Sequence, residues 1–293
     1  MRIIDYGESY GRSVTLCAGR YESLHRGHAQ IIKKAVEAAK KNGSEVMLMT
    51  FDERDNARFG RVILTYPERI SAAEKLGVSS VLRIDFTDSF KSVSAEDFLL
   101  EISRKLNIAG IFCGYDFRFG KDRCGDAASL KRFCSERNLY FSEIGKIELN
   151  GEKISSSSVK NALSAGDIEK ANAMLGYAYF ISGVVKEGRH DGTAIGFPTA
   201  NISWPDDKAT LKEGVYAARS TIDGKEYAGI TNYGPAPTFG FGNVTCETHF
   251  KGYVGNLYGR ALTLHFDAFL RDIRAFSCID ELKEQLFDDL KKV

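Results

Sequence analysis

The feature that most constrains this sequence is the regular alternation of short apolar runs with longer amphipathic segments through its first half. A strand-length apolar run followed by an amphipathic segment of about ten to fifteen residues is typical of the repeating unit of a parallel sheet. The alternation therefore predicts an α/β doubly wound parallel sheet. The predicted strands are residues 13–18, 45–51, 80–86, 108–114 and 139–144, and the predicted helices are residues 27–41, 67–76, 95–106 and 127–137.

The pattern changes after residue 177. Residues 154–176 still have helical character, and Gly166 and Gly176 stand where helix C-caps are expected. The runs that follow are short and alternate with a period of two, and Asp223-Gly224 is typical of a hairpin turn. These features predict a small antiparallel β-barrel followed by a terminal helix. The predicted barrel strands are residues 215–222, 225–231, 244–250 and 261–269, and the predicted helix is residues 280–290.

We therefore predict two domains, residues 1–176 and residues 177–293. Hydrophobic residues make up 43% of the chain and charged residues 27%, so that each part has enough apolar material for a core. The 40 basic and 39 acidic residues leave a net charge of +1, which disfavours a nucleic-acid partner.

No apolar run approaches the ~18 residues that span a bilayer, and the N-terminus has no apolar core of signal-peptide length. The six cysteines are scattered without a C-x-x-C pair, which indicates neither a zinc site nor a disulfide framework. We therefore expect a cytoplasmic protein without a membrane partner. Its protein partners and oligomeric state cannot be read from the sequence.

A first candidate site is the tetrad His25-Arg26-Gly27-His28, which follows the first predicted strand and opens a helix. A helix N-terminus presents free N–H groups and partial positive charge, and both favour phosphate. Two imidazoles at this position can donate hydrogen bonds to a phosphate that gains charge in a transition state. Metal ligation and simple helix capping are the alternative interpretations of the tetrad.

A second element, Lys153-Ile154-Ser155-Ser156-Ser157, opens another predicted helix far downstream. Its serine hydroxyls and N–H groups can bind phosphate oxygens, and a flexible loop is the alternative. Together with the histidine tetrad it resembles the HIGH and KMSKS elements of the nucleotidyltransferase superfamily.

The segment 113–125 places Asp116 and Arg118 between Phe117 and Phe119, directly after a predicted strand. These side chains could hold a polar aromatic ligand beside the sheet. The alternative is a core aromatic pair flanked by a surface ion pair.

In the second half, glycines 188, 192 and 196 permit close approach of the backbone to phosphates. Pro198 stiffens the turn before Thr199 and Asn201, whose oxygens suit Mg²⁺ beside a nucleotide. An ordinary glycine-rich hairpin is the alternative.

Glu247 lies in the predicted strand 244–250, where a period of two places it on one face with Thr245 and His249. A carboxylate there could accept the proton of a hydroxyl that attacks a γ-phosphate. A solvated strand glutamate is the alternative.

Taken together, five separated strings resemble the prokaryotic bifunctional riboflavin kinase/FAD synthetase (FMN adenylyltransferase) family over essentially the whole chain. They are GRYESLHRGH (19–28), CGYDFRFG (113–120), KISSSSVKNAL (153–163), GFPTANI (196–202) and FLRDIRAF (269–276).

The resemblance implies a nucleotidyltransferase-type N-terminal domain that converts FMN and ATP to FAD and pyrophosphate. His25 and His28 would stabilise the transition state there. The residues implied in nucleotide binding are Gly19, Tyr21, Gly27, Ser155, Ser156 and Ser157, and those implied in flavin binding are Asp116 and Arg118.

The resemblance also implies a C-terminal domain that phosphorylates riboflavin to FMN with ATP and Mg²⁺. Glu247 matches the family's proposed base, and Thr199 and Asn201 match its Mg²⁺-nucleotide residues. Gly192 and Gly196 would lie against the nucleotide, and Arg271 falls in the family's flavin loop.

The sequence departs from the family pattern mainly in its first half. Glu22 and Ser23 stand where the family usually has Asp and Gly, and Glu53-Arg54-Asp55 stands where it has Pro-His-Pro. Two alternatives therefore stay open: a monofunctional riboflavin kinase with a degenerate nucleotide-binding domain, and a non-catalytic flavin carrier or sensor.

Overall fold

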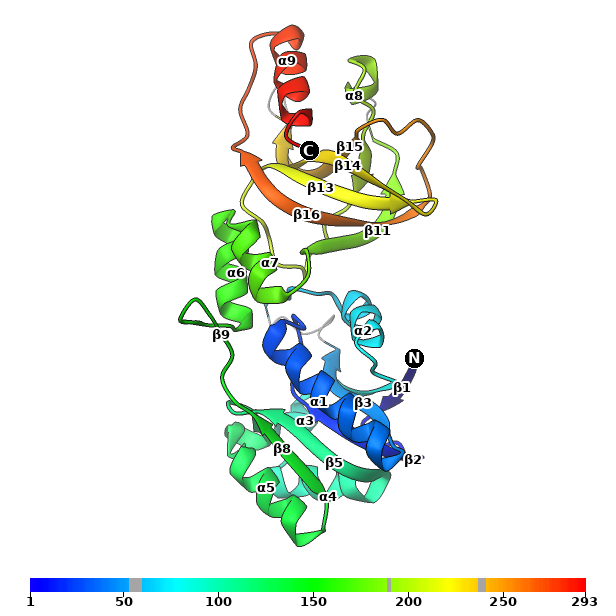
Figure 1. Ribbon diagram of the computed structural model, residues 1–293, viewed down its shortest axis with the longest axis vertical. Coiled ribbons are helices and arrows are strands. Elements are labelled where there is room, and N and C mark those ends of the chain that lie inside the picture. The colour runs from blue at the N-terminus through cyan, green and yellow to red at the C-terminus, as the bar shows by residue number, and fades with distance from the viewer. Residues whose placement is uncertain (53–59, 189–190, 237–240) are drawn as a thin grey trace. The chain divides into compact units, whose positions relative to one another are not determined.

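The chain forms two compact units, Met1–Ser156 and Ser157–Val293. The computed structural model describes residues 1–52, 60–188, 191–236 and 241–293 (Figure 1). Helices α6 (Ser156–Ala165) and α7 (Ile168–Leu175) fall almost entirely in the second unit by their contacts. The domain boundary at residue 176 stays a prediction.

A parallel six-stranded sheet forms the centre of the first unit, as the alternating pattern predicts. The strand order is β1-β4-β3-β2-β5-β8, so the chain leaves β2 in one direction through β3 and in the other through β5. This reversal beside β2 is the point at which doubly wound sheets bind ligands, outside the carboxyl ends of the strands. The strands are β1 (Arg2–Asp5), β2 (Tyr10–Ala18), β3 (Glu45–Asp52), β4 (Ser80–Asp85), β5 (Leu106–Gly114) and β8 (Tyr140–Ile144).

Helices cover both faces of this sheet, which explains the continuous burial of residues 14–18 in β2. Helix α1 (Arg26–Asn42) packs against β2, β3 and β5 through a buried stripe that includes Ile32 and Ala35. Val14 and Leu16 contribute to the core that contains Phe98 and Leu130 of other helices. The remaining helices of this unit are α2 (Tyr66–Lys75), α3 (Asp88–Lys91), α4 (Ala95–Lys105) and α5 (Ala127–Glu136).

Several short elements follow the strands β5 and β8 of the sheet. A two-stranded hairpin and a 3₁₀ turn follow β5, and a second hairpin precedes α6. Gly176 caps α7 in the left-handed conformation at φ 82°, as its position in the sequence predicts. These small elements are β6 (Arg118–Phe119), η2 (Lys121–Arg123), β7 (Gly125–Asp126), β9 (Glu148–Leu149) and β10 (Glu152–Lys153).

The second unit contains a closed antiparallel barrel, in agreement with the prediction. Its strand order is β11-β12-β15-β14-β13-β16. Asp223 and Gly224 join β13 to β14 with φ values of 51° and 78°, the conformation that a tight hairpin requires. The elements are β11 (Phe180–Lys186), α8 (Asp191–Ala194), β12 (Ala200–Ile202), β13 (Gly214–Ile222), β14 (Lys225–Ala236), β15 (Phe241–Phe250), β16 (Ala261–Arg271) and α9 (Ile279–Leu290).

Among the strands of the parallel sheet and the barrel, the sequence analysis misses β1, β11 and β12, and it also misses the two-residue strands β6, β7, β9 and β10. β1 has four residues and β12 three, which is too short for an alternating pattern to stand out. β11 is the strand that closes the barrel, because it pairs with both β12 and β16. Its pairing depends on partners that are distant in the sequence.

The barrel is filled by aromatic side chains, including Trp204, the one tryptophan of the chain. The Trp204 ring lies 4.5 Å from that of Tyr233, and Phe266 lies 5.6 Å from Tyr216, measured between ring centroids. The fluorescence of Trp204 will therefore report on unfolding of this unit.

We predict that Gly229→Ala destabilises the barrel. A Cβ at Gly229 would lie 2.3 Å from the carbonyl oxygen of His249 on the paired strand β15, so the two strands must separate. The expected loss is about 1–3 kcal/mol of unfolding free energy, the range typical of overpacking. Denaturant titration followed by Trp204 fluorescence measures it.

The control is Val184→Ala, because Val184 is an exposed residue of β11. Its unfolding free energy should stay within about 0.5 kcal/mol of the wild type. Equal stability of Gly229→Ala and the control would contradict the prediction.

Candidate active sites

The loop after β2 has an unusual backbone conformation. Tyr21 and Leu24 have φ values of 54° and 46°, in the left-handed region that non-glycine residues adopt at a cost. Both side chains are buried, and a Cβ at Gly19 would lie 2.7 Å from the Tyr21 ring. Gly19 thus makes room for Tyr21, whose burial holds the loop in the turn that leads into α1.

The two histidines meet at the N-terminus of α1. His25 is the N-cap residue, and its Nδ1 accepts a hydrogen bond of 3.2 Å from the backbone N–H of His28. The two imidazole rings stack with their centroids 3.8 Å apart. A Cβ at Gly27 would lie 3.0 Å from Cε1 of His25, so the glycine leaves room for that ring. Because Nδ1 accepts, the proton of a neutral His25 is assigned to Nε2, where it can be donated to a ligand.

Both imidazoles are neutral at pH 7. Burial lowers the pKa of His25 from 6.5 to about 4. Burial also lowers the pKa of His28 well below 6.5, and the neighbouring His25 and Arg69 lower it further. A neutral ring retains one N–H donor and brings no charge to the site. The pair is therefore suited to donate hydrogen bonds rather than to act as cations.

The serine run comes together with the histidines, although the two motifs are far apart in the sequence. The hydroxyl oxygen of Ser23 lies 3.0 Å from that of Ser156 and 3.5 Å from Nδ1 of His28. Ser156 is the first residue of α6, which confirms that the serine run opens a helix. Ser155 and Ser157 flank it at the same helix end. The hydroxyl of Ser23 therefore lies beside the His28 ring, and the hydroxyl of Ser156 lies beside that of Ser23.

Asp116 and Lys153 complete the first site. The Lys153 Nζ lies 2.8 Å from Oδ2 of Asp116 and 5.0 Å from the centre of the Tyr115 ring. The hydrogen bond that Lys153 donates to Asp116 raises the pKa of Lys153. The charges of Asp116 and Lys153 both act on the pKa of His25, which shows that the pair lies close to that ring. The site thus contains an ammonium group whose partner is a carboxylate.

Arg118 is positioned differently. Its guanidinium makes an ion pair of 2.9 Å with Asp126 across the β6–β7 hairpin, and the rings of Phe117 and Phe119 stack 5.5 Å apart. Phe119 is buried. An aromatic pair flanked by an ion pair is the alternative that the sequence leaves open for this segment. The role of Arg118 in flavin binding stays a prediction.

A buried arginine beside this site escapes the sequence analysis. The guanidinium of Arg69, in α2, is fully buried and donates to Oγ1 of Thr50 at 2.8 Å and to the carbonyl of Phe51 at 3.0 Å. The Thr50 hydroxyl donates in turn to the carbonyl of Arg20 at 2.6 Å. Arg69 therefore ties the end of β3 to the loop after β2. A single arginine in an amphipathic helix carries no sequence signal for such a role.

Glu22 and Ser23, the two departures from the family pattern in the loop after β2, both make defined contacts. Glu22 is buried, and its carboxylate lies 3.0 Å from the guanidinium of Arg20. Its backbone carbonyl accepts a hydrogen bond from the N–H of Leu64. Ser23 makes the contact with Ser156 described above. The third departure, Glu53-Arg54-Asp55, lies outside the described residues.

The second site lies where β12 and β15 pair in the barrel. Asn201 stands opposite Glu247 in the register of the two strands, and the Thr199 hydroxyl donates a long hydrogen bond of 3.4 Å to Oε2 of Glu247. Thr245, Glu247 and His249 are half-buried on one face of β15, whereas Cys246 and Thr248 on the other face are buried. The predicted face of the strand is thereby confirmed.

The glycines of the second site have steric roles. Gly196 has a φ of 90°, which favours glycine. A Cβ at Gly192 would lie 2.3 Å from the carbonyl oxygen of Phe197, and one at Gly188 would lie 2.3 Å from Nδ2 of Asn201. Larger residues at 188 and 192 would displace the segment that contains Thr199 and Asn201.

This segment is fastened to β15 by His249. Nδ1 of His249 lies 2.9 Å from the carbonyl oxygen of Pro198, and its ring lies 5.1 Å from the ring of Phe197. These contacts fix the segment immediately before Thr199. The hydroxyl and amide oxygens of Thr199 and Asn201 are of the kind that fits Mg²⁺, a cation that prefers oxygen ligands. Within the described ranges, no cluster of three or more His, Cys, Asp or Glu residues is arranged to hold a metal ion.

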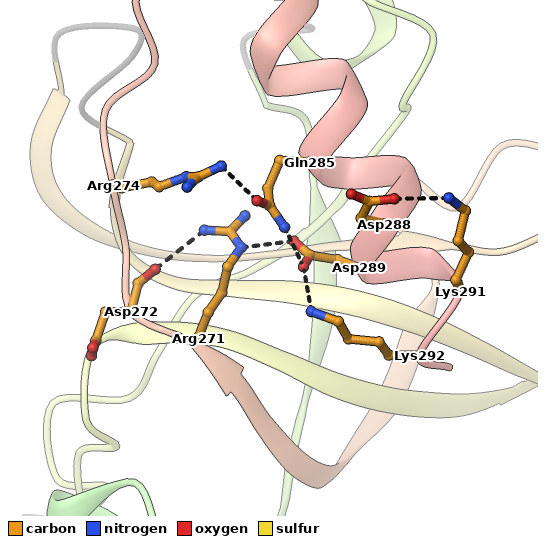
Figure 2. Close-up of polar contacts among 8 residues, drawn as sticks. All are labelled: Arg271, Asp272, Arg274, Gln285, Asp288, Asp289, Lys291 and Lys292. Carbon is orange, nitrogen blue, oxygen red and sulfur yellow. Dashed lines mark hydrogen bonds and ion pairs between the residues drawn. The ribbon is translucent and has the colours of Figure 1, made fainter.

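Arg271 contacts the C-terminal helix. Its Nε donates to Oδ2 of the fully buried Asp289 at 2.8 Å, and its Nη1 donates to the carbonyl of Asp272 at 3.2 Å (Figure 2). Flavin binding by Arg271 stays a prediction.

Two protein-family models match the chain one after the other. The model described as FAD synthetase matches residues 8–158, just over half of the chain, and the model described as riboflavin kinase matches residues 175–293.

Several bacterial proteins named bifunctional riboflavin kinase/FMN adenylyltransferase are similar over almost the whole chain. The Bacillus subtilis (strain 168) protein is 30% identical, with 96% of this chain and 92% of the relative covered. The Pseudomonas fluorescens protein is 31% identical, with 95% and 91% covered. The Escherichia coli (strain K12) protein is 30% identical, with 94% and 90% covered.

A crystal structure of a macrolide-efflux protein from Streptococcus pneumoniae has a TM-score of 0.88 to this chain. The match covers 99% of this chain and 98% of that chain at 24% sequence identity. At this identity, the likeness shows the fold alone. Among the helices of the described segments, none is both long and apolar enough to cross a membrane.

The depressed pKa of His25 predicts an acid-dependent loss of stability. The unfolded chain takes up a proton on this residue near pH 6.5, but the folded chain does so only near pH 4. The free energy of unfolding that depends on the protonation of His25 is therefore at its full value above pH 6.5, and it decreases as the pH falls toward 4. NMR titration of the His25 ring should give a midpoint near 4, and His25→Asn should abolish this part of the pH dependence of unfolding. A midpoint near 6.5 would contradict the prediction.

Proposed function

The chain belongs to the family of bifunctional riboflavin kinase/FMN adenylyltransferases, and from this we propose how its two units perform the two reactions. The barrel unit phosphorylates riboflavin with ATP to give FMN and ADP, and the first unit joins FMN to AMP from a second ATP to give FAD and pyrophosphate. The observation that carries this assignment is that each family model matches one of the two folds, the FAD synthetase model the parallel sheet and the riboflavin kinase model the barrel.

In the barrel, we assign proton acceptance to Glu247. The 5′-hydroxyl oxygen of riboflavin attacks the γ-phosphorus of ATP, the bond to ADP breaks, and the hydroxyl proton passes to the carboxylate. The hydrogen bond from Thr199 and the register with Asn201 orient that carboxylate. We assign Mg²⁺ binding to the side-chain oxygens of Thr199 and Asn201, and we propose that Gly192 and Gly196 let the backbone approach the nucleotide. Bound Mg²⁺ would neutralise charge on the phosphates.

In the first unit, a phosphate oxygen of FMN attacks the α-phosphorus of ATP, and pyrophosphate leaves. The attacking oxygen is already ionised, so the step needs no base. The neutral rings of His25 and His28 donate hydrogen bonds to oxygens that gain charge in the transition state. The N-terminus of α6 and the hydroxyls of Ser155, Ser156 and Ser157 bind phosphate oxygens.

The remaining residues of the first site position the substrates. Gly19, Tyr21 and Gly27 shape the loop that receives the nucleotide, because they seat the loop after β2 and the His25 ring. Asp116 helps to hold the flavin or the nucleotide, and it also orients Lys153 through their ion pair. Arg118, on the nearby hairpin, is the second proposed flavin contact.

We further propose that the partners of this protein are small molecules: ATP, riboflavin and FMN. The almost equal numbers of basic and acidic residues argue against nucleic acid as a partner. All six cysteines are free thiols, which favours a reducing compartment and hence the cytoplasm.

The experiment that tests the proposal is chromatography of flavins after incubation of the purified protein with ATP and Mg²⁺. One reaction starts from riboflavin and a parallel reaction starts from FMN. We expect FAD from both. FMN as the only product would contradict adenylyl transfer by the first unit, and omission of Mg²⁺ should abolish the kinase step.

We predict that Glu247→Gln slows FMN formation by at least about tenfold and leaves the conversion of FMN to FAD unchanged, because the amide cannot accept the hydroxyl proton. Initial rates of both steps measure the effect. The control is Glu226→Gln, an exposed glutamate of β14 in the same barrel. Equal losses in both steps would argue against the assignment of Glu247.

His28→Ala should have the opposite effect. We expect a loss on the order of 10²–10³ in FAD formation from FMN, the range found when a donor to a developing oxyanion is removed. Riboflavin phosphorylation by the same variant should stay at the wild-type rate and so serves as the internal control. A wild-type rate of FAD formation would remove His28 from the mechanism.

A further inference from the structure

The C-terminal helix α9 contacts the barrel unit through apolar side chains, among them Phe287, whose ring lies 5.1 Å from that of Phe197 between centroids. Of its twelve residues, Leu282 and Asp289 are the buried ones. Burial of one leucine contributes about 1.5–3 kcal/mol, whereas a buried carboxylate is costly unless it is paired and hydrogen-bonded. The groups that satisfy Asp289 therefore help to fix the position of α9, together with the hydrogen bonds that Lys251 donates to the carbonyls of Leu290 and Val293.

Those groups form a network between α9 and the segment after β16. Asp289 accepts hydrogen bonds from Nε of Arg271 at 2.8 Å and from Nε2 of Gln285 at 2.9 Å. Nζ of Lys292 lies 3.4 Å from Oδ1 of Asp289. Oε1 of Gln285 accepts from the guanidinium of Arg274 at 2.5 Å. Figure 2 shows Arg271 bound to the carboxylate of Asp289 and Arg274 bound to Gln285, which in turn contacts Asp289.

The same network holds the segment 272–276. The guanidinium of Arg274 lies 4.6 Å from the centre of the Phe276 ring, and that of Arg271 lies 5.8 Å from it. Arg271, Arg274 and Phe276 are thus all held by contacts that lead back to Asp289. These contacts fix one side of the segment.

The other side of the segment lies against the strands that carry the proposed base. A Cβ at Gly234 would lie 2.5 Å from Cδ1 of Ile273, so Ile273 rests directly on β14. Gly234 stands opposite Thr245, and Asn232 stands opposite Glu247 in the same pair of strands. A shift of the segment 272–276 would therefore displace β14 at Gly234, which pairs with Thr245, two residues before Glu247.

We infer that Asp289 is a positioning residue for riboflavin: through Arg271 and Gln285 it holds the segment 272–276 beside Glu247 in the arrangement that receives the flavin. The inference rests on the proposed kinase function of the barrel. It assigns to Arg271 the role of fixing this segment, since its Nε is used by Asp289.

The test compares Asp289→Asn with Asp288→Asn in the full-length protein. Asp288 is the exposed neighbour, whose ion pair with Lys291 stays within α9, and it is a matched control. Asp289→Asn removes the charge that pairs Arg271, and we expect the KM for riboflavin to rise about tenfold. The KM for ATP should change less than twofold, and the control should match the wild type. FAD formation from FMN should be unchanged.

A structural role alone would lower the stability of the barrel without separating the two KM values. A wild-type KM for riboflavin in a folded Asp289→Asn protein, or an equal rise in both KM values, would overturn the inference.

If that variant does not fold, as judged by Trp204 fluorescence, Gln285→Ala takes its place. It retains the Arg271–Asp289 pair but releases Arg274, and we expect a rise of roughly two- to fivefold in the riboflavin KM alone; no rise would overturn the inference. If the wild-type protein produces no FMN, the proposed function itself fails, which is distinguishable from these outcomes.

Discussion

Ionisable groups that are buried away from water need internal partners. Each unit contains one such buried charge, Arg69 in the first unit and Asp289 in the second, and its partners lie in segments beside a candidate site. In the first unit the guanidinium of Arg69 donates to the Thr50 hydroxyl and the Phe51 carbonyl, and Thr50 donates to the carbonyl of Arg20. In the second unit the carboxylate of Asp289 is satisfied by Arg271 and Gln285. Because each buried charge is costly when unpaired, each holds its partners in place. The partners belong to the segments that shape the two sites.

The two sites use different electrostatics because the two reactions differ. Adenylyl transfer starts from an ionised phosphate, and the buried histidines beside Arg69 are neutral hydrogen-bond donors. Riboflavin phosphorylation starts from a neutral hydroxyl, and the barrel provides a half-buried carboxylate that can accept its proton. In the proposed mechanism the first site stabilises charge, and the second removes a proton. This division agrees with membership of a bifunctional family.

The sequence predicted most of the fold, because its strongest elements carry local patterns. Five of the six strands of the parallel sheet, the hairpin at Asp223-Gly224 and the terminal helix were visible as apolar periods and turn residues. β12 was missed because three residues cannot display a period, and β11 because its role is to close a barrel through distant partners. The glycines at 19, 192 and 196 were recognised as special positions. The atoms that leave no room for a Cβ at 19 and 192, and the positive φ at 196, became visible only in the structure.

By itself, the sequence determined the residue types of both sites, the family and the order of the two folds, since these follow from strings of neighbouring residues. Only the tertiary structure brought Ser23 to Ser156, buried Arg69 beside the histidine site, and paired Arg271 with Asp289. It also decided that the histidines are neutral, because burial sets their pKa values. Contacts and burial of this kind depend on segments that are far apart in the chain, and no local pattern of residues encodes them.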